Sequence, residues 1–216
     1  MSREETLKTL CDVGIVPVVR AKSADVLVDL AKALIAGGVP VAEVTLTVPG
    51  AIDGIRKLVA TFGKDLLVGV GSVTRVEQVE EAVAAGAEFV VGPVLIPEVI
   101  AAARKCGKVV VPGALTPTEA FQAHTLGADI VKIFPANVGG PAYFKAILAP
   151  MPFLKLMPTG GVDLDTAGAF IKAGAVTLGA GTSLVDNVAI QKGDWAAITR
   201  LARQFREEVK KARAKA

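Results

Sequence analysis

Two charged residues stand inside otherwise apolar stretches of this chain, and both could do chemistry. Lys132 lies in "DIVKIFPA" (129–136) and Glu43 lies in "VAEVTLT" (41–47). Strands of a parallel sheet that is covered on both faces are nearly continuous apolar runs, and Lys and Glu are rarely fully buried. A dry site favours the neutral form of a lysine amine, which can attack a ketone and form a Schiff base.

The pair fits one reaction type. A Schiff base on Lys132 would act as an electron sink, so that a neighbouring carbon–carbon bond can break and leave an enamine. Glu43 could move the protons that carbinolamine formation, dehydration and cleavage require. The structural alternative is that the lysine extends to solvent or pairs with Glu43 for stability alone. No His, Asp and Glu residues have metal-ligand spacing, which favours Schiff-base over metal-assisted chemistry, and we expect no metal and no cofactor.

Further polar or pocket-forming residues follow the ends of predicted strands. Arg20 could hold a substrate carboxylate through two hydrogen bonds, or it could form a salt bridge with a neighbouring loop. Thr47 lies on the same side of its strand as Glu43 by alternation. Ser72 follows the glycines of "GVGSVT", and Pro93 follows the fourth predicted strand.

Two glycine clusters follow the last two predicted strands. "TGG" contains Thr159, Gly160 and Gly161, and "GAG" ends at Gly181 and is followed by Thr182. Backbone amides in such turns, beside the start of a helix, can bind phosphate. The alternative is that both are simply tight turns. Their position on adjacent strands favours phosphate.

The pattern of apolar runs predicts the elements that position these residues. A helix that ends in Ala-Gly or Leu-Gly and is followed at once by an apolar strand recurs along the chain, and Gly37, Gly86, Gly127 and Gly174 suit the left-handed position after a helix. Eight alternating units favour a TIM (β/α)8 barrel over a doubly wound open sheet. An additional N-terminal helix is expected over 2–12, and further helices near 24–36, 75–85, 117–126 and 163–173. The predicted strands lie near 15–20, 41–47, 66–71, 88–92, 108–112, 129–134, 154–158 and 176–180.

Composition narrows the class of protein. The chain has 216 residues, of which 52% are hydrophobic, and a net charge of +3, which is too small to indicate nucleic-acid binding. Cys11 and Cys106 lie too far apart for a CxxC motif, and no apolar run reaches membrane-spanning length. With a charged start and no linker, we expect one cytoplasmic domain over 1–216 with no membrane partner. His124 is expected on a helix away from the strand ends.

Six segments together resemble one family. "VAEVTLTVPGAIDGI", "GVGSVTRVEQ", "VPGALTPTEA", "DIVKIFPA", "MPTGGV" and "GAGTSLV" occur in the order found in the 2-keto-3-deoxy-6-phosphogluconate (KDPG)/4-hydroxy-2-oxoglutarate (KHG) aldolase family, from about residue 8 to 205. The resemblance implies a class I aldolase on a TIM barrel. It also implies that the protein assembles as a homotrimer. The implied reaction is cleavage of KDPG to pyruvate and D-glyceraldehyde 3-phosphate.

The resemblance also implies roles for single residues. Lys132 matches the Schiff-base lysine and Glu43 the proton-shuttling carboxylate. Residues that match substrate-binding positions are Arg20, Ser72, Pro93, Gly160, Gly161, Gly181 and Thr182, while Thr47 stands where other members have an arginine. Three positions depart from the family's usual pattern: Ser72 replaces a threonine, Gly92 replaces a serine, and Ala180 precedes Gly181 in place of a second glycine.

Several functions remain open from the sequence. KDPG cleavage is the leading hypothesis, and a related keto acid (4-hydroxy-2-oxoglutarate, the galactonate epimer or an unphosphorylated sugar acid) is the alternative within the class. A phosphosugar isomerase could use a glutamate base without a Schiff-base lysine. A non-catalytic symmetric scaffold is a third possibility, against which the presence of both Lys132 and Glu43 argues.

Overall fold

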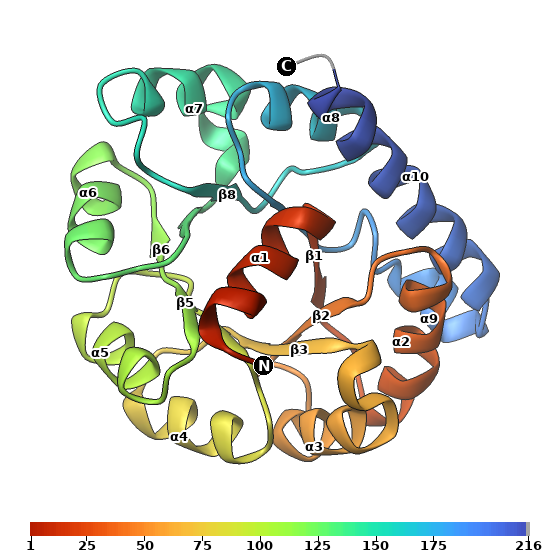
Figure 1. The fold of residues 1–216 in the computed structure, drawn as a ribbon. Helices are drawn as coiled ribbons and strands as arrows, with labels where there is room; N and C mark the ends of the chain where they lie inside the picture. Colours follow the sequence, from red (N-terminus) through yellow and green to blue (C-terminus); the bar gives the residue numbers. More distant parts are fainter. Residues whose placement is uncertain (215–216) are drawn as a thin grey trace.

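The computed structural model describes residues 1–214, and they form a barrel of parallel strands surrounded by helices (Figure 1). The strands are β1 (Ile15–Val19), β2 (Val41–Thr45), β3 (Leu67–Gly71), β4 (Phe89–Val91), β5 (Val109–Val111), β6 (Gly113–Ala114), β7 (Val131–Ile133), β8 (Leu156–Pro158) and β9 (Leu178–Ala180). The α-helices are α1 (Arg3–Val13), α2 (Leu27–Ala36), α3 (Ala51–Phe62), α4 (Val76–Ala84), α5 (Pro97–Lys105), α6 (Pro117–Thr125), α7 (Gly140–Leu148), α8 (Leu164–Lys172), α9 (Asn187–Lys192) and α10 (Trp195–Arg213), with 3₁₀ turns η1 (Ala24–Val26), η2 (Gly63–Asp65) and η3 (Ala136–Val138). The prediction of a TIM-type barrel with an extra N-terminal helix is confirmed.

Strand pairing runs around the barrel in two sheets. One sheet has the order β5-β4-β3-β2-β1-β9 and the other the order β6-β7-β8, and single bridges between Leu156 and Ala175 and between Thr159 and Gly179 connect β8 to β9. The fifth predicted strand, near 108–112, is β5, and a further two-residue strand, β6, follows after Pro112. Because proline has no N–H group to donate, it interrupts a ladder of hydrogen bonds. The prediction of a strand near 108–112 is confirmed, and the sequence did not predict the separate short strand β6.

Most helix ends follow the predicted signals. Thr116 and Asp163 cap α6 and α8 through their side chains. Gly86, Gly127 and Gly174 have φ values of 101°, 94° and 100°, as the prediction of left-handed turns requires.

Gly37 is an exception. Its φ is −82°, because its amide still continues α2 by donating to Ala33, and Gly38 takes the left-handed turn at φ 80°. A Cβ at Gly37 would lie 2.4 Å from the Cβ of Ala202 in α10. The glycine is therefore required for close helix packing and not for the turn that the sequence predicted.

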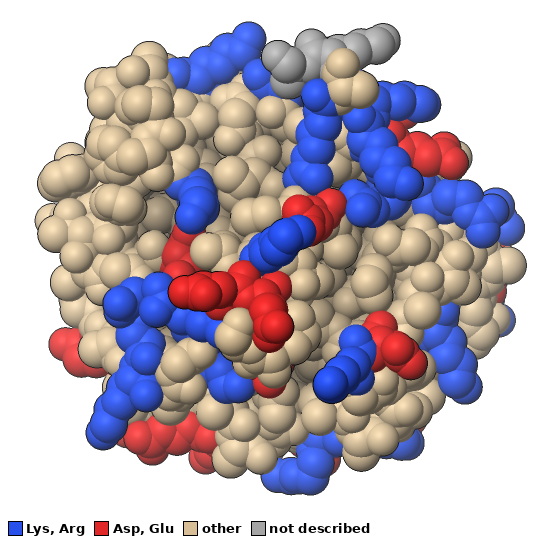
Figure 2. All heavy atoms as spheres, in the orientation of Figure 1, with Lys and Arg blue, Asp and Glu red and all other residues tan. Residues whose placement is uncertain are grey.

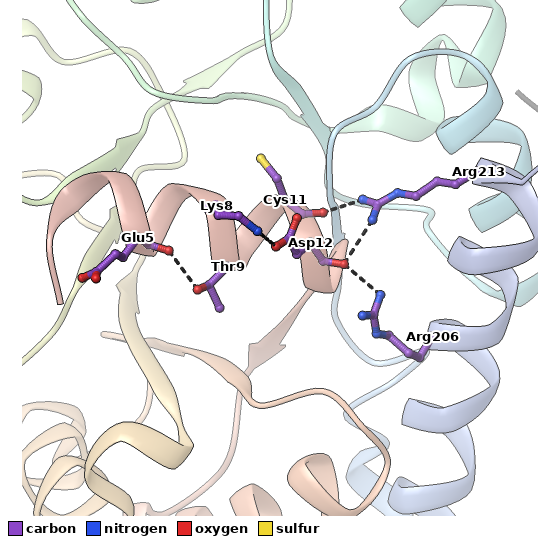
Figure 3. Close-up of polar contacts among 7 residues, drawn as sticks. All are labelled: Glu5, Lys8, Thr9, Cys11, Asp12, Arg206 and Arg213. Carbon is purple, nitrogen blue, oxygen red and sulfur yellow. Dashed lines mark hydrogen bonds and ion pairs between the residues drawn. The ribbon is translucent and has the colours of Figure 1, made fainter.

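Helix α1 covers the end of the barrel at which the strands begin (Figure 1). Arg3 pairs with Asp129 at 2.9 Å, and the other oxygen of Asp129 accepts a hydrogen bond from the Val110 amide. At the other end of α1, Arg206 and Arg213 of α10 donate to the carbonyl oxygen of Asp12 (Figure 3). The last carbonyls of a helix lack intrahelical partners, so these arginines satisfy the end of α1.

Acidic and basic side chains lie next to one another over and around α1 (Figure 2). Helix α1 covers the end of the barrel at which the strands begin (Figure 1). A binding site is therefore expected at the opposite end, where the strands finish. Within residues 1–214, no helix has both the length and the apolar character needed to cross a membrane.

Candidate active site

Lys132 and Glu43 both lie in the wall of the barrel with their side chains buried. Lys132 is in register with Gly113 on one side and Met157 on the other, and its exposed fraction is 4%. Glu43 is in register with Val18 and Gly69, and its exposed fraction is 0%. Lys132 therefore does not extend to solvent, which removes the first structural alternative for it.

The space around Glu43 is created by a glycine on the neighbouring strand. A Cβ at Gly71 would lie 2.1 Å from Oε1 of Glu43, so no other residue at this position leaves the carboxyl group where it is. Neither carboxyl oxygen of Glu43 has a hydrogen-bond partner among the described residues. A buried polar group without a partner costs free energy, and such groups concentrate at functional sites.

The environment of Glu43 favours its protonated form. Burial raises the pKa of this carboxyl group above its ordinary value, and the positive charges of Lys132 and Arg20 oppose the rise. A carboxyl group whose pKa is moved toward neutrality can both donate and accept a proton during a reaction. Glu43 is thus suited to general acid–base chemistry beside the Lys132 amine.

An aromatic ring lies beside the Lys132 amine. Lys132 Nζ is 5.2 Å from the centre of the Phe134 ring, which is within the range of a cation–π contact. Phe134 lies two residues after Lys132, so both side chains project from the same face of the strand. The ring limits where an incoming carbonyl carbon can approach the amine.

The ends of β1 and β2 are connected by threonine hydroxyl groups. Thr45 Oγ1 donates to the carbonyl of Val19 at 2.9 Å and shares a hydrogen bond of 2.7 Å with Thr47 Oγ1. Arg20 follows β1 directly and its side chain is exposed. The structure therefore places Arg20 and Thr47 at the same end of two adjacent strands.

A cavity of about 270 Å³ lies at this end of the barrel. We call it the glycine-loop cavity, because both glycine clusters line it. Its lining residues are Val18, Arg20, Phe134, Thr159, Gly160, Gly161, Val162, Asp163, Gly181, Thr182, Ser183 and Val185. Six of the residues singled out from the sequence are brought together here: Arg20, Thr159, Gly160, Gly161, Gly181 and Thr182.

The cavity offers hydrogen-bond donors that the protein does not use. Within residues 1–214, the backbone N–H groups of Gly160, Gly161 and Thr182 donate to no protein acceptor. The Thr159 hydroxyl group is buried and has no partner among the described residues. Unsatisfied backbone amides from two adjacent loops are the chemistry that binds an anion.

Lys132 and Glu43 lie outside the lining of the glycine-loop cavity, and so do three further singled-out residues. Thr47 is held by Thr45, as described above. Ser72 follows β3 and has a φ of 63°, a value that is uncommon for a residue other than glycine. Pro93 follows β4, where its carbonyl approaches the backbone of Gly113. Ser72 and Pro93 follow their strands, as the sequence predicted, whereas Thr47 was expected inside the strand 41–47 and lies in a turn after β2, which ends at Thr45.

Sequence reasoning missed Phe134 and Asp163 as residues of the site. The signal for Phe134 was present, because alternation places it on the same face as Lys132. The local sequence around Asp163 indicates only a helix cap, and no local pattern shows that a cap also lines a cavity. His124, as expected, lies away from the site, with its ring 4.9 Å from that of Phe153.

Comparison with known proteins finds one family. The model of the "KDPG and KHG aldolase" family matches residues 6–201. A 2-dehydro-3-deoxy-phosphogluconate aldolase of Pseudoalteromonas atlantica is 38% identical, with 88% of each chain covered. A KHG/KDPG aldolase of Escherichia coli is 35% identical over 91% of this chain and 92% of the relative.

Solved structures of aldolases resemble this chain in fold and in sequence. A KDPG aldolase from Legionella pneumophila, with pyruvate captured as a covalent carbinolamine, has a TM-score of 0.83 and 32% identity over 92% of this chain and 96% of that one. A structure described as native KDPGal has a TM-score of 0.86 and 30% identity, covering 93% of this chain and 96% of that one.

Proposed function

We propose that this chain, which belongs to the KDPG and KHG aldolase family, cleaves KDPG to pyruvate and D-glyceraldehyde 3-phosphate. The proposed reaction proceeds through a Schiff base on Lys132. The protein is a carbon–carbon lyase of the class I type. The observation that supports the proposal most directly is the burial of Lys132 together with Glu43, whose two carboxyl oxygens have no partner among the described residues.

The first half of the reaction joins substrate to enzyme. The neutral Lys132 amine attacks the C2 carbonyl carbon and gives a carbinolamine. Protonated Glu43, directly or through one water molecule, donates a proton to the departing hydroxyl group, so that water leaves and an iminium ion forms. The raised pKa of Glu43 keeps that proton available.

The second half breaks the carbon–carbon bond. Glu43, now ionised, accepts the proton of the C4 hydroxyl group, the C3–C4 electron pair moves into the iminium, and the aldehyde leaves. Glu43 then gives this proton to C3 of the enamine, and water hydrolyses the new iminium to release pyruvate and the free amine, with the released proton going to Glu43. Every proton that Glu43 donates is returned to it within one turnover.

The remaining residues position the two ends of the substrate. Arg20, with the hydroxyl groups of Ser72 and Thr47 nearby on adjacent loops, is proposed to hold the carboxylate next to the keto group. The glycine-loop cavity is proposed to hold the phosphate at the other end, through its free backbone amides and the Thr182 hydroxyl group. Pro93 and Thr159 would limit the width of the pocket.

Replacing Thr182 by valine is expected to weaken binding of the phosphorylated substrate alone. Valine keeps the shape of the side chain and removes its hydroxyl donor, so KM for KDPG should rise by about tenfold to a hundredfold, which corresponds to the loss of one hydrogen bond to a charged group. Steady-state assays with KDPG and with its unphosphorylated analogue measure the effect. An equal rise in KM for both substrates would remove this role from Thr182.

The state of the protein in the cell is also proposed. The family implies a homotrimer of single-domain chains. The two cysteines, Cys11 and Cys106, are unpaired, which suits a reducing compartment such as the cytoplasm.

A further inference from the structure

We propose that Asp163 determines part of the substrate specificity, by reducing the preference of the glycine-loop cavity for a phosphate group over a neutral, hydroxyl-bearing end. This role rests on the proposed function, because it concerns the end of the substrate that lies away from Lys132. It adds to that function a carboxylate that works against the anion the loops would bind.

The glycine-loop cavity has few charged residues in its lining. Of its twelve lining residues, Arg20 and Asp163 are the two with charged side chains. Arg20 follows β1 and is proposed to hold the substrate carboxylate. Arg20 is the one cation in the lining, and no lysine or second arginine joins it to offset the negative charge of Asp163.

Asp163 is held in place and is ionised. Its Oδ1 accepts hydrogen bonds from the Thr166 amide at 2.8 Å and from the Thr166 hydroxyl group at 2.9 Å. These bonds lower the pKa of the Asp163 carboxyl group below its ordinary value. Within residues 1–214, Oδ2 of Asp163 has no hydrogen-bond partner, so it remains an acceptor for a substrate hydroxyl group.

The position of Asp163 also reduces the attraction of helix α8 for anions. The start of a helix carries a partial positive charge that favours phosphate, and a carboxylate in the capping position compensates that charge. The neighbouring Ser183 does not replace the lost attraction, because its hydroxyl group donates to the carbonyl of Val162 at 2.6 Å. Anion binding at this end therefore depends on neutral donors, which are the free backbone amides and the threonine hydroxyl groups of the lining.

Replacing Asp163 by asparagine tests the charge without removing the helix cap, since Asn caps helices as well as Asp does. We expect kcat/KM for KDPG to rise by about threefold to tenfold, as removal of one like charge beside a dianion allows. For the unphosphorylated analogue, 2-keto-3-deoxygluconate, we expect no rise, because that end carries no charge. The ratio of the two kcat/KM values is the quantity to compare with the unchanged enzyme.

Salt and a second substitution separate charge from structure. Raising the salt concentration from about 0.01 M to about 1 M shortens the screening length from about 30 Å to about 3 Å, so the gain of the Asp163→Asn variant should decrease. Asp163→Ser also keeps a capping oxygen and should shift the ratio in the same direction. The role of Asp163 is overturned if the gain in kcat/KM for KDPG does not depend on the salt concentration. It is also overturned if the ratio of the two kcat/KM values shifts in Asp163→Asn but not in Asp163→Ser.

Asp165 provides the matched control. It lies in the first turn of the same helix, is exposed, and does not line the glycine-loop cavity. Asp165→Asn should leave the ratio unchanged, and a shift equal to that of Asp163→Asn would assign the effect to the general field of α8.

If the unchanged enzyme releases no pyruvate from either substrate, the proposed function itself fails and this role falls with it. If it cleaves both and the Asp163 variants leave the ratio unchanged, the proposed function stands and only this role is wrong.

Discussion

Replacement of Lys132 by alanine lowers kcat for pyruvate release by about 10⁴-fold or more, because the covalent route is lost with the amine. The fold should survive, because the Lys132 amine forms no salt bridge with another described residue that the substitution would break. Coupled detection of released pyruvate measures the loss. Retention of the circular dichroism spectrum shows that the barrel is intact.

Lys172→Ala is the matched control for this prediction. Lys172 is an exposed lysine in the last turn of α8, on a helix outside the barrel. The account expects its kcat to equal that of the unchanged enzyme. An Lys132→Ala variant that retains more than about a hundredth of the original kcat would mean that the amine does not carry the reaction.

Replacement of Glu43 by glutamine lowers kcat by about 10²-fold to 10⁴-fold and changes KM little. Glutamine fills the space beside Gly71 without a carboxyl proton, so substrate still reaches Lys132 but proton transfer fails. Single-turnover experiments with one equivalent of substrate should show slow formation of the Schiff base on Lys132. A loss confined to KM would assign Glu43 to binding instead.

The same variant changes how stability depends on pH. Burial raises the pKa of Glu43 in the folded protein above the ordinary value of 4.5, so folding becomes less favourable as pH rises from about 4.5 to the raised pKa. Below pH 4.5 the carboxyl group is protonated in both states and the cost is absent. Relative to the unchanged protein, Glu43→Gln should therefore gain stability as pH rises through this window and then level off. Urea denaturation at several pH values measures the difference, and a constant difference would contradict a raised pKa.

The two charged residues of the barrel could be identified from the sequence for a physical reason. Lys132 and Glu43 interrupt apolar runs that local pattern alone defines, and alternation assigns their side chains to one face of a strand. The loops "TGG" and "GAG" follow strands directly, so their place at one end of the barrel follows from the topology. Burial of both charged groups agrees with those predictions, while their catalytic roles remain predictions.

Other features depend on contacts between segments that are distant in the sequence. The fit of Gly71 against Glu43 and of Gly37 against Ala202 becomes visible only when the packed neighbours are known. The short strand β6 after Pro112 depends on its pairing with β7. Asp163 shows the same limit, because its cap was readable from the local sequence whereas the cavity that it lines is not.

Borohydride trapping tests the central claim most directly. Reduction in the presence of pyruvate should convert the Schiff base into a stable secondary amine, and peptide mass spectrometry should find the added pyruvyl group on Lys132. The Lys132→Ala protein should remain unlabelled under the same conditions. An unmodified Lys132, or a pyruvyl group on another lysine in its place, would contradict the account.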